Sequence, residues 1–235
     1  MKICGITRPE DAVEAWRLGV WAIGFVFAPS PRRVSPVTAA DLVKRVREVA
    51  LTGGAGPEDR RTRCFPLCIG VFGEAPVDEI VKTVDEVGLD GVQLHGRMGP
   101  EAAEVRAALQ ARPRADDRPV AVIRAVPVDP SCTSPVELRE KIARAAPGAD
   151  LLVLDTLAGR QFGGTGKTFG WDLAKQVTER PFLIAGGIGP GNVKEAVVQS
   201  GAWGVDVSSG VESSPGVKDH QLMAELVRAA KTVRS

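Results

Sequence analysis

The stretch "KICGITRPEDAVEAWRLGVWAIGFVF", residues 2–27, contains one complete strand–helix–strand unit. Lys2–Cys4 and Ala22–Phe27 are short and mostly apolar, as strands that are buried on both faces are. Between them, Thr7 and Glu10 have the spacing of a capping box, and Gly19 lies where a helix can end. The stretch therefore predicts two strands connected by an amphipathic helix.

The same alternation continues to the end of the chain. Six further strand candidates are Leu67–Phe72, Gly91–Leu94, Val120–Ala125, Leu151–Leu154, Phe182–Ala185 and Val205–Val207. Helical periodicity follows in 76–88, in 191–201 and in a last segment with Leu222, Leu226, Ala229 and Val233 on one face. Eight β-then-α units in 235 residues predict an α/β protein with the (β/α)₈ (TIM) barrel fold.

A doubly wound open sheet is the alternative, because it also alternates strand and helix. The first strand is not followed by a Gly-rich fingerprint, which argues against the dinucleotide-binding version of that fold. The polar segments 52–63 and 112–118 resemble surface loops rather than linkers, since the alternation resumes after each. We therefore expect one domain spanning residues 1–235.

Composition and charge exclude several classes of protein. Hydrophobic residues make up 44% and charged residues 25% of the chain, as in ordinary globular proteins. A net charge of +1 argues against broad binding to nucleic acid or to an anionic membrane. The chain has no apolar run long enough to span a bilayer and no signal-peptide core near its start, so a cytoplasmic location is expected. Four cysteines without a C-x-x-C pair, and only two histidines, predict no metal site.

The loop "GRQFGGTGKTFGW", residues 159–171, ends in a Gly-Lys-Thr that suggests a P-loop. A P-loop requires a glycine five positions before Gly166, where this chain has Gln161. The register therefore excludes a P-loop. We expect a long loop that folds over the mouth of the barrel and excludes water, with Lys167 near a phosphate; a plain surface loop is the alternative.

Working residues in such barrels lie at the C-terminal ends of strands and in the loops that follow. The loops after strands 7 and 8 commonly bind phosphate, and here they carry Gly186 and Gly187, with exposed backbone N–H groups, and Ser208 and Ser209, with hydroxyl donors. The sequence therefore predicts a phosphate site between these two loops, although glycines that only make turns are the alternative.

The remaining candidates each have a structural alternative. Cys4 and Asp155 form a possible acid–base pair at two strand ends, but a small buried thiol is the commoner role of such a cysteine. Arg32 can hold a carboxylate with two hydrogen bonds, although a solvated arginine such as its neighbour Arg33 is commoner. His95 suits a general base, but we favour a histidine that is hydrogen-bonded within the rim.

The full set of motifs resembles phosphoribosylanthranilate isomerase, a family of tryptophan biosynthesis. The matching segments are "KICGIT" at 2–7, "GFVFAPSPRRVSP" at 24–36, "VQLHG" at 92–96, "LDT" at 154–156, "GGTGKTFGW" at 163–171, "AGGIGPGNV" at 185–193 and "DVSSGVESSPGVKD" at 206–219. They stand in the family's order from the second residue to the last helix. Gly170 is a departure, because relatives usually have Asp there.

The resemblance implies an Amadori rearrangement of a phosphorylated aminoaldose, with no metal or cofactor and in a monomer or homodimer. Cys4 is then the general base, Asp155 the general acid, and Arg32 the ligand of the anthranilate carboxylate. Substrate contacts are also expected at Gly164, Gly186, Gly187, Asp206, Ser208 and Ser209. Rival readings are a sugar-phosphate epimerase, the related histidine-pathway isomerase, which typically uses two aspartates, and a phosphate-ligand binder without catalysis.

Overall fold

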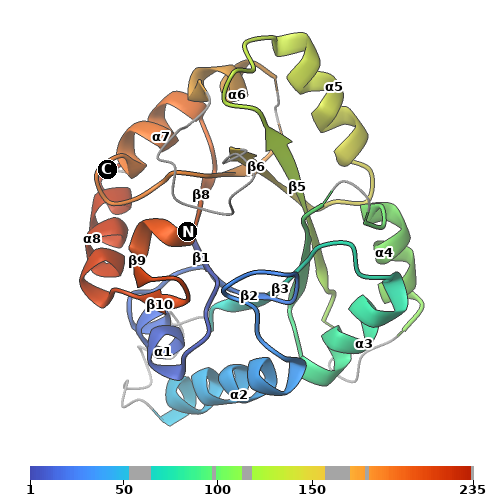
Figure 1. Ribbon diagram of the computed structural model, residues 1–235, viewed down its shortest axis with the longest axis vertical. Helices are drawn as coiled ribbons and strands as arrows, with labels where there is room; N and C mark the ends of the chain where they lie inside the picture. Colours follow the sequence, from blue (N-terminus) through green and yellow to red (C-terminus); the bar gives the residue numbers. More distant parts are fainter. Residues whose placement is uncertain (53–64, 97–98, 113–117, 157–169, 178–179, 234–235) are drawn as a thin grey trace.

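The computed structural model describes residues 1–52, 65–96, 99–112, 118–156, 170–177 and 180–233. Within them, eight parallel strands close into a barrel in chain order, and helices surround it (Figure 1). The strands are β1 (Lys2–Cys4), β2 (Ala22–Val26), β3 (Leu67–Phe72), β4 (Gly91–Leu94), β5 (Ala121–Val128), β6 (Leu151–Thr156), β7 (Phe182–Ala185) and β8 (Gly204–Val207). The predicted (β/α)₈ barrel is therefore confirmed.

One helix follows each strand in the described residues. The helices are α1 (Pro9–Arg17), α2 (Pro36–Thr52), α3 (Val77–Val87), α4 (Ala102–Gln110), α5 (Pro135–Ala145), α6 (Trp171–Val177), α7 (Val193–Ser200) and α8 (His220–Lys231). Between β8 and α8 lie the short 3₁₀ helix η2 (Ser209–Val211) and a small antiparallel pair, β9 (Glu212–Ser214) and β10 (Val217–Lys218). Helix α8 contacts both α7 and α1, which completes the ring.

Two predictions about local structure were wrong. The capping box does not form, because α1 begins at Pro9 after Arg8, and the Thr7 hydroxyl donates instead to the Gly216 carbonyl. The ladder between β5 and β6 continues to the pair Val128–Thr156. Asp155 is therefore a residue of β6, although the sequence prediction placed it after the strand.

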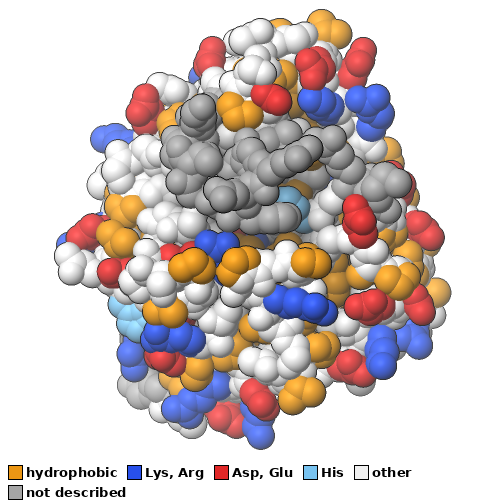
Figure 2. Space-filling model, viewed as in Figure 1, with side chains coloured by type: hydrophobic (Ala, Val, Ile, Leu, Met, Phe, Trp, Pro, Cys, Tyr) orange, Lys and Arg blue, Asp and Glu red, His pale blue; other side chains and the backbone are white. Residues whose placement is uncertain are grey.

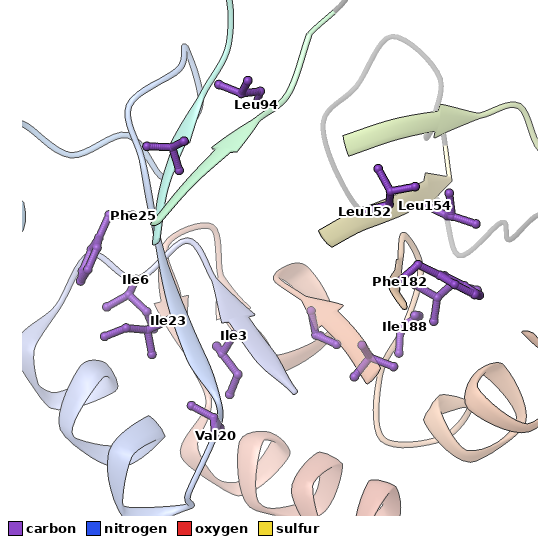
Figure 3. Packing of buried hydrophobic residues seen from close by; sticks show 14 of the residues in the cluster. Ile3, Ile6, Val20, Ile23, Phe25, Leu94, Leu152, Leu154, Phe182 and Ile188 are labelled. Carbon is purple, nitrogen blue, oxygen red and sulfur yellow. The ribbon is translucent and has the colours of Figure 1, made fainter. Parts of the chain in front are cut away.

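Two hydrophobic clusters follow from the alternation of side chains along each strand. The larger one packs the outer faces of the strands against the helices. Figure 3 shows Ile6, Ile23 and Phe25 together on one side of the barrel, and Leu152, Leu154 and Phe182 together on another. The smaller cluster fills the barrel interior and consists of Ala22, Ile69, Ile123, Ala125, Leu151, Val153, Leu183 and Ala185. The interior is thus a packed core, as this fold requires.

Near the carboxyl ends of the strands the interior becomes polar. Lys2 and Cys4 are two residues apart on β1, so their side chains point to the same face of the strand. Lys2 is paired in register with Asp206 of β8. Asp206 is paired with Ala185 of β7, and Ala185 is paired with Asp155 of β6. The sheet register thereby places three ionisable residues at one level across four neighbouring strands.

The distribution of charge on one face, and the character of the described helices, can be compared with the sequence expectations. Acidic and basic side chains are mixed over the face seen in Figure 2. In the described part of the chain, no helix combines the length and apolar character needed to cross a bilayer.

Candidate active site

Cys4 ends β1, and its sulfur lies in a gap that β2 leaves open. Cys4 is paired in register with Gly24, and a side-chain carbon built on Gly24 would lie 2.8 Å from Cys4 Sγ and 3.2 Å from Lys2 Nζ. Real Cβ atoms do not approach other atoms as closely as 2.8 Å. The missing side chain at Gly24 therefore makes the room in which the thiol and the ammonium group meet.

Lys2 is completely buried and donates a hydrogen bond of 2.7 Å from Nζ to Oδ2 of Asp206. Burial alone would lower the pKa of Lys2, but the charge of Asp206 and the nearby Cys4 outweigh it and raise the Lys2 pKa above its usual value. Lys2 is therefore an ammonium ion at neutral pH. The other carboxylate oxygen, Asp206 Oδ1, is buried and has no hydrogen-bond partner among the described residues.

The thiol of Cys4 is subject to opposing influences. Burial is the largest of them and raises the pKa of Cys4, while the positive charge of Lys2 opposes that rise. The charge of Asp206 raises the Cys4 pKa further, and that of Lys218 lowers it. The net pKa lies above the ordinary value, so Cys4 without substrate is a thiol at neutral pH.

Asp155 and His95 form the second ionisable pair. His95 follows β4, and its Nε2 lies 3.0 Å from Oδ2 of Asp155. The hydrogen bond with Asp155 raises the pKa of His95, although burial opposes it. Both side chains remain partly exposed, at 34% for His95 and 29% for Asp155. The favoured prediction for His95, a hydrogen-bonded histidine at the rim, agrees with this contact.

Arg32 is held by a carboxylate of the protein itself. Its Nε and Nη2 donate to the two oxygens of Glu212 at 2.8 and 2.6 Å, and Lys218 Nζ donates to Oε1 of Glu212 at 2.7 Å. Burial opposes ionisation of Glu212, but Arg32 and Lys218 hold the Glu212 pKa below its usual range. Arg32 is only 9% exposed. It is not a solvated surface arginine, and Glu212 fixes its orientation.

The loops after β7 and β8 border an open, shallow hollow of about 340 Å³. Its walls are formed by Gly187, Ile188, Gly189, Gly191, Asn192, Ser209 and Gly210. Gly186 and Gly187 have φ angles of 88° and 67°, a backbone conformation that favours glycine, and Asn192 braces the loop by donating to the Gly187 carbonyl. The hollow is lined by Asn192, which precedes α7, and by Ser209, which begins η2, an arrangement suited to an anion.

The predicted site residues do not all meet in this hollow. Ser209 and Gly187 line it, whereas Ser208 lies beside it and accepts bonds from Lys218 Nζ through its carbonyl and hydroxyl oxygens. Gly164 and Lys167, and with them the expected covering loop, lie outside the described residues. The segments 53–63 and 113–117 of the two polar loops lie outside them as well.

Sequence reasoning missed Lys2, Glu212 and Lys218. The two-residue spacing on a predicted strand was enough to place Lys2 on the same face as Cys4. Glu212 and Lys218 stand in a quoted motif, but nothing local indicated that they would enclose Arg32, which is 180 residues away from Glu212. In the described residues, no group of three or more His, Cys, Asp or Glu side chains gathers where it could hold a metal ion.

The sequence of the chain is similar to those of known proteins of one family. The family model described as N-(5'phosphoribosyl)anthranilate (PRA) isomerase matches residues 58–229. The N-(5'-phosphoribosyl)anthranilate isomerase of Rubrobacter xylanophilus is 38% identical over 237 residues, which cover 99% of this chain and 98% of the relative. That of Roseiflexus sp. is 39% identical over 98% of this chain and 97% of the relative.

Solved structures that superpose on this chain belong to the same family. The phosphoribosyl anthranilate isomerase of Thermotoga maritima superposes with a TM-score of 0.75 at 32% identity, covering 98% of both chains. A phosphoribosyl anthranilate isomerase in complex with reduced 1-(o-carboxyphenylamino)-1-deoxyribulose 5-phosphate superposes with a TM-score of 0.70 at 30% identity, covering 98% of this chain and 97% of that one. The fold, the full-length similarity and the family model agree, and the chain belongs to the N-(5'-phosphoribosyl)anthranilate isomerase family.

Proposed function

We propose that the chain converts N-(5-phosphoribosyl)anthranilate into 1-(2-carboxyphenylamino)-1-deoxyribulose 5-phosphate, with Cys4 as general base and Asp155 as general acid. Family membership supports the reaction, an intramolecular isomerisation in tryptophan biosynthesis. One observation carries the division of roles: Cys4 and Asp155 lie at the carboxyl ends of β1 and β6, and each contacts a different ionisable partner. Two groups with different environments are suited to two different proton transfers.

The acid step opens the ribose ring. Asp155 gives a proton to the ring oxygen, the bond from C1′ to that oxygen breaks, and the lone pair of the anthranilate nitrogen forms a C=N bond, which gives the Schiff base. A general acid needs a proton at neutral pH, and the contact between Asp155 Oδ2 and His95 Nε2 keeps one at hand. The hydrogen bond with Asp155 raises the pKa of His95, so His95 can hold a proton at this contact and supply it to the ring oxygen by way of Asp155.

The base step removes the proton from C2′. Cys4, after losing its thiol proton to solvent, takes this proton as the thiolate. The electrons of the C–H bond form the C1′=C2′ double bond, and those of the C=N double bond return to the anthranilate nitrogen, which gives an enolamine. The enolamine then gains a proton at C1′ and loses one from the 2′ oxygen, which gives the ketone. The reaction is redox-neutral overall and requires only that protons change place, so the residues of the chain are sufficient for it.

Two anion sites hold the substrate by its ends. Arg32 has five N–H donors, of which Glu212 uses two in the described structure, so the guanidinium can also donate to the anthranilate carboxylate. The 5′-phosphate is assigned to the hollow lined by Gly187 and Ser209, with Gly186 and Ser208 as neighbouring contacts. Gly164 stays a predicted contact, because it lies outside the described residues. Asp206 Oδ1, buried without a partner in the described residues, is assigned to a ribose hydroxyl. Binding both ends positions the sugar between acid and base.

The decisive experiment follows the loss of phosphoribosylanthranilate fluorescence with purified wild-type protein, Cys4→Ala and Asp155→Asn. We expect each substitution to lower kcat by about 10²–10⁴-fold with a smaller effect on KM. Cys68→Ala is the matched control, because Cys68 is a thiol buried outside the site at 2% exposure, and its kcat should stay near wild type.

The possible failures are distinct. Absence of turnover by the wild-type protein, with turnover of the histidine-pathway aminoaldose instead, would overturn the reaction. Near-normal kcat for Asp155→Asn would leave the reaction in place and remove Asp155 as its acid. Near-normal kcat for Cys4→Ala would leave the reaction in place and remove Cys4 as its base.

A further inference from the structure

Lys2 is a buried charge that neither proton-transfer step uses. It is 0% exposed, and its register partner Ala22 belongs to the apolar cluster of the barrel interior, together with Ile69 and Leu183. Moving an ammonium group from water into such an interior is unfavourable even after relaxation, because the group loses its hydration. A well-packed apolar side chain at this position would avoid that cost, so the charge at Lys2 calls for an explanation beyond packing.

Asp206 accounts for only part of that charge. The 2.7 Å bond from Nζ to Asp206 Oδ2 fixes the ammonium group at the junction of β1 and β8. On the other side Nζ borders the space above Gly24, which Cys4 Sγ borders as well. A hydrogen bond from Lys2 and its positive charge both favour the thiolate form of Cys4. Lys2 therefore stands between two groups that are anions or become anions.

The other charges that act on Cys4 are weaker or oppose the thiolate. Asp206, from β8, disfavours it, and Lys218, from β10, favours it less strongly than Lys2 does. Arg32, at the barrel mouth, also interacts with Cys4, but Glu212 holds its guanidinium. On the far side of the interior the Asp155–His95 pair is coupled to Lys2 and Asp206 through His95. Among all these groups Lys2 is the main cation acting on the sulfur.

We propose that Lys2 is a positioning residue for the base: its buried ammonium group, anchored by Asp206, is the counter-ion of the Cys4 thiolate that accepts the C2′ proton. The role of Cys4 as base rests on the proposed function, whereas the charge relation between Lys2 and Cys4 exists without substrate. Asp206 has the opposite effect on the sulfur, so the two partners of the ion pair bias the thiol in opposite directions.

The test measures the pH dependence of Cys4 alkylation by iodoacetamide, which reacts with the thiolate and needs no substrate. The rate is recorded for wild type, Lys2→Met and Asp206→Asn, and the rate of Cys4→Ser protein is subtracted to remove the contribution of the other cysteines. Burial raises the pKa of Cys68 to about 12, so this thiol contributes little. We expect the midpoint to rise by about one unit or more in Lys2→Met and to fall in Asp206→Asn.

Lys2→Met leaves the Asp206 carboxylate buried without its cation, so the variant is checked for folding by near-ultraviolet circular dichroism. If it does not fold, Lys2→Met/Asp206→Asn replaces it, because that pair buries no charge. The double variant should still show a raised midpoint, since Lys2 acts on Cys4 more strongly than Asp206 does. A midpoint equal to that of the wild type, in the folded single or double variant, overturns the proposal.

The pH profile of kcat/KM provides the second readout. In Lys2→Met the rising limb should move to higher pH, so that the loss of activity, about tenfold or more at neutral pH, shrinks at alkaline pH. A purely structural role for Lys2 predicts an equal loss at every pH, and that result would also overturn the proposal. If the wild type fails to turn over the substrate, the proposed function fails, and the alkylation experiment still decides the relation between Lys2 and Cys4.

Discussion

The proposed mechanism divides the barrel mouth into a base side, formed by Lys2, Cys4 and Asp206, and an acid side, formed by His95 and Asp155. Each side contains two ionisable side chains at hydrogen-bond distance, 2.7 Å for Lys2–Asp206 and 3.0 Å for His95–Asp155. The pairs differ in burial, because the Lys2 and Asp206 side chains are 0% and 6% exposed, whereas those of His95 and Asp155 are 34% and 29% exposed.

The difference in burial affects the electrostatic interaction within each pair more than the small difference in distance does. Charges attract each other more strongly where water is excluded, so the base side is a fixed electrostatic environment. The acid side is about one-third exposed, so water can reach His95 and Asp155. A fixed environment suits a thiol whose ionisation must be controlled, and an accessible one suits an acid that must regain its proton in every cycle.

The largest expected contrast is in stability. Lys2→Met removes the partner of a buried carboxylate and should lower the free energy of unfolding by about 3–5 kcal/mol. His95→Asn breaks a pair that is one-third exposed and should cost at most about 1 kcal/mol. Urea denaturation of both variants and the wild type at pH 7 measures the contrast. Equal losses for the two variants would contradict the distinction between the two sides.

The barrel itself could be predicted from sequence, because its strands are apolar runs and its helices have one apolar face, and both patterns are local. β7 and α3 illustrate this: Phe182–Ala185 was predicted residue for residue, and the apolar face of the 76–88 segment is the buried face of α3. Boundaries that depend on a neighbour were harder. β6 extends to Thr156 because β5 pairs with it that far, and no pattern within residues 151–156 shows this.

The site could be predicted in part for the same reason. Cys4, Asp155, Gly187 and Ser209 stand at strand ends or in loops that the fold brings to one face, so knowing the fold was enough to select them. The contact of Arg32 with Glu212 joins residues 180 positions apart, and it depends on how β9 lies over the mouth. Such contacts are set by tertiary packing, which sequence periodicity does not encode.

An intermediate effect is expected in the titration of His95. Its pKa is raised by Asp155, so the pair stabilises the folded state fully below the ordinary histidine pKa of about 6.5 and loses this contribution as pH rises through the higher folded value. NMR titration of the His95 ring should show a midpoint above about 6.5 in the wild type. In Asp155→Asn the raising influence is lost while burial remains, so the midpoint should fall.

His220 provides an internal control, because it pairs with Asp11 rather than with Asp155. Its chemical shifts at a fixed pH should be the same in wild type and Asp155→Asn, which shows that the substitution acts locally. An unchanged His95 midpoint in the variant would show that Asp155 does not control the protonation of His95. The contrast drawn between the two sides would then no longer hold for the acid side.

The smallest effect concerns the helix that follows the acid side. Gly170 precedes α6, where the family usually has Asp, and a side-chain carbon placed on Gly170 would lie 3.1 Å from Asp172 Oδ1. A capping side chain here should stabilise the protein by a few tenths of a kcal/mol, but an Asp at 170 would place two carboxylates side by side. We therefore expect Gly170→Ser to raise Tm by about 1 °C, and Gly170→Asp to raise it less. Calorimetry distinguishes them, and a larger gain for Asp would mean that the helix dipole outweighs the repulsion from Asp172.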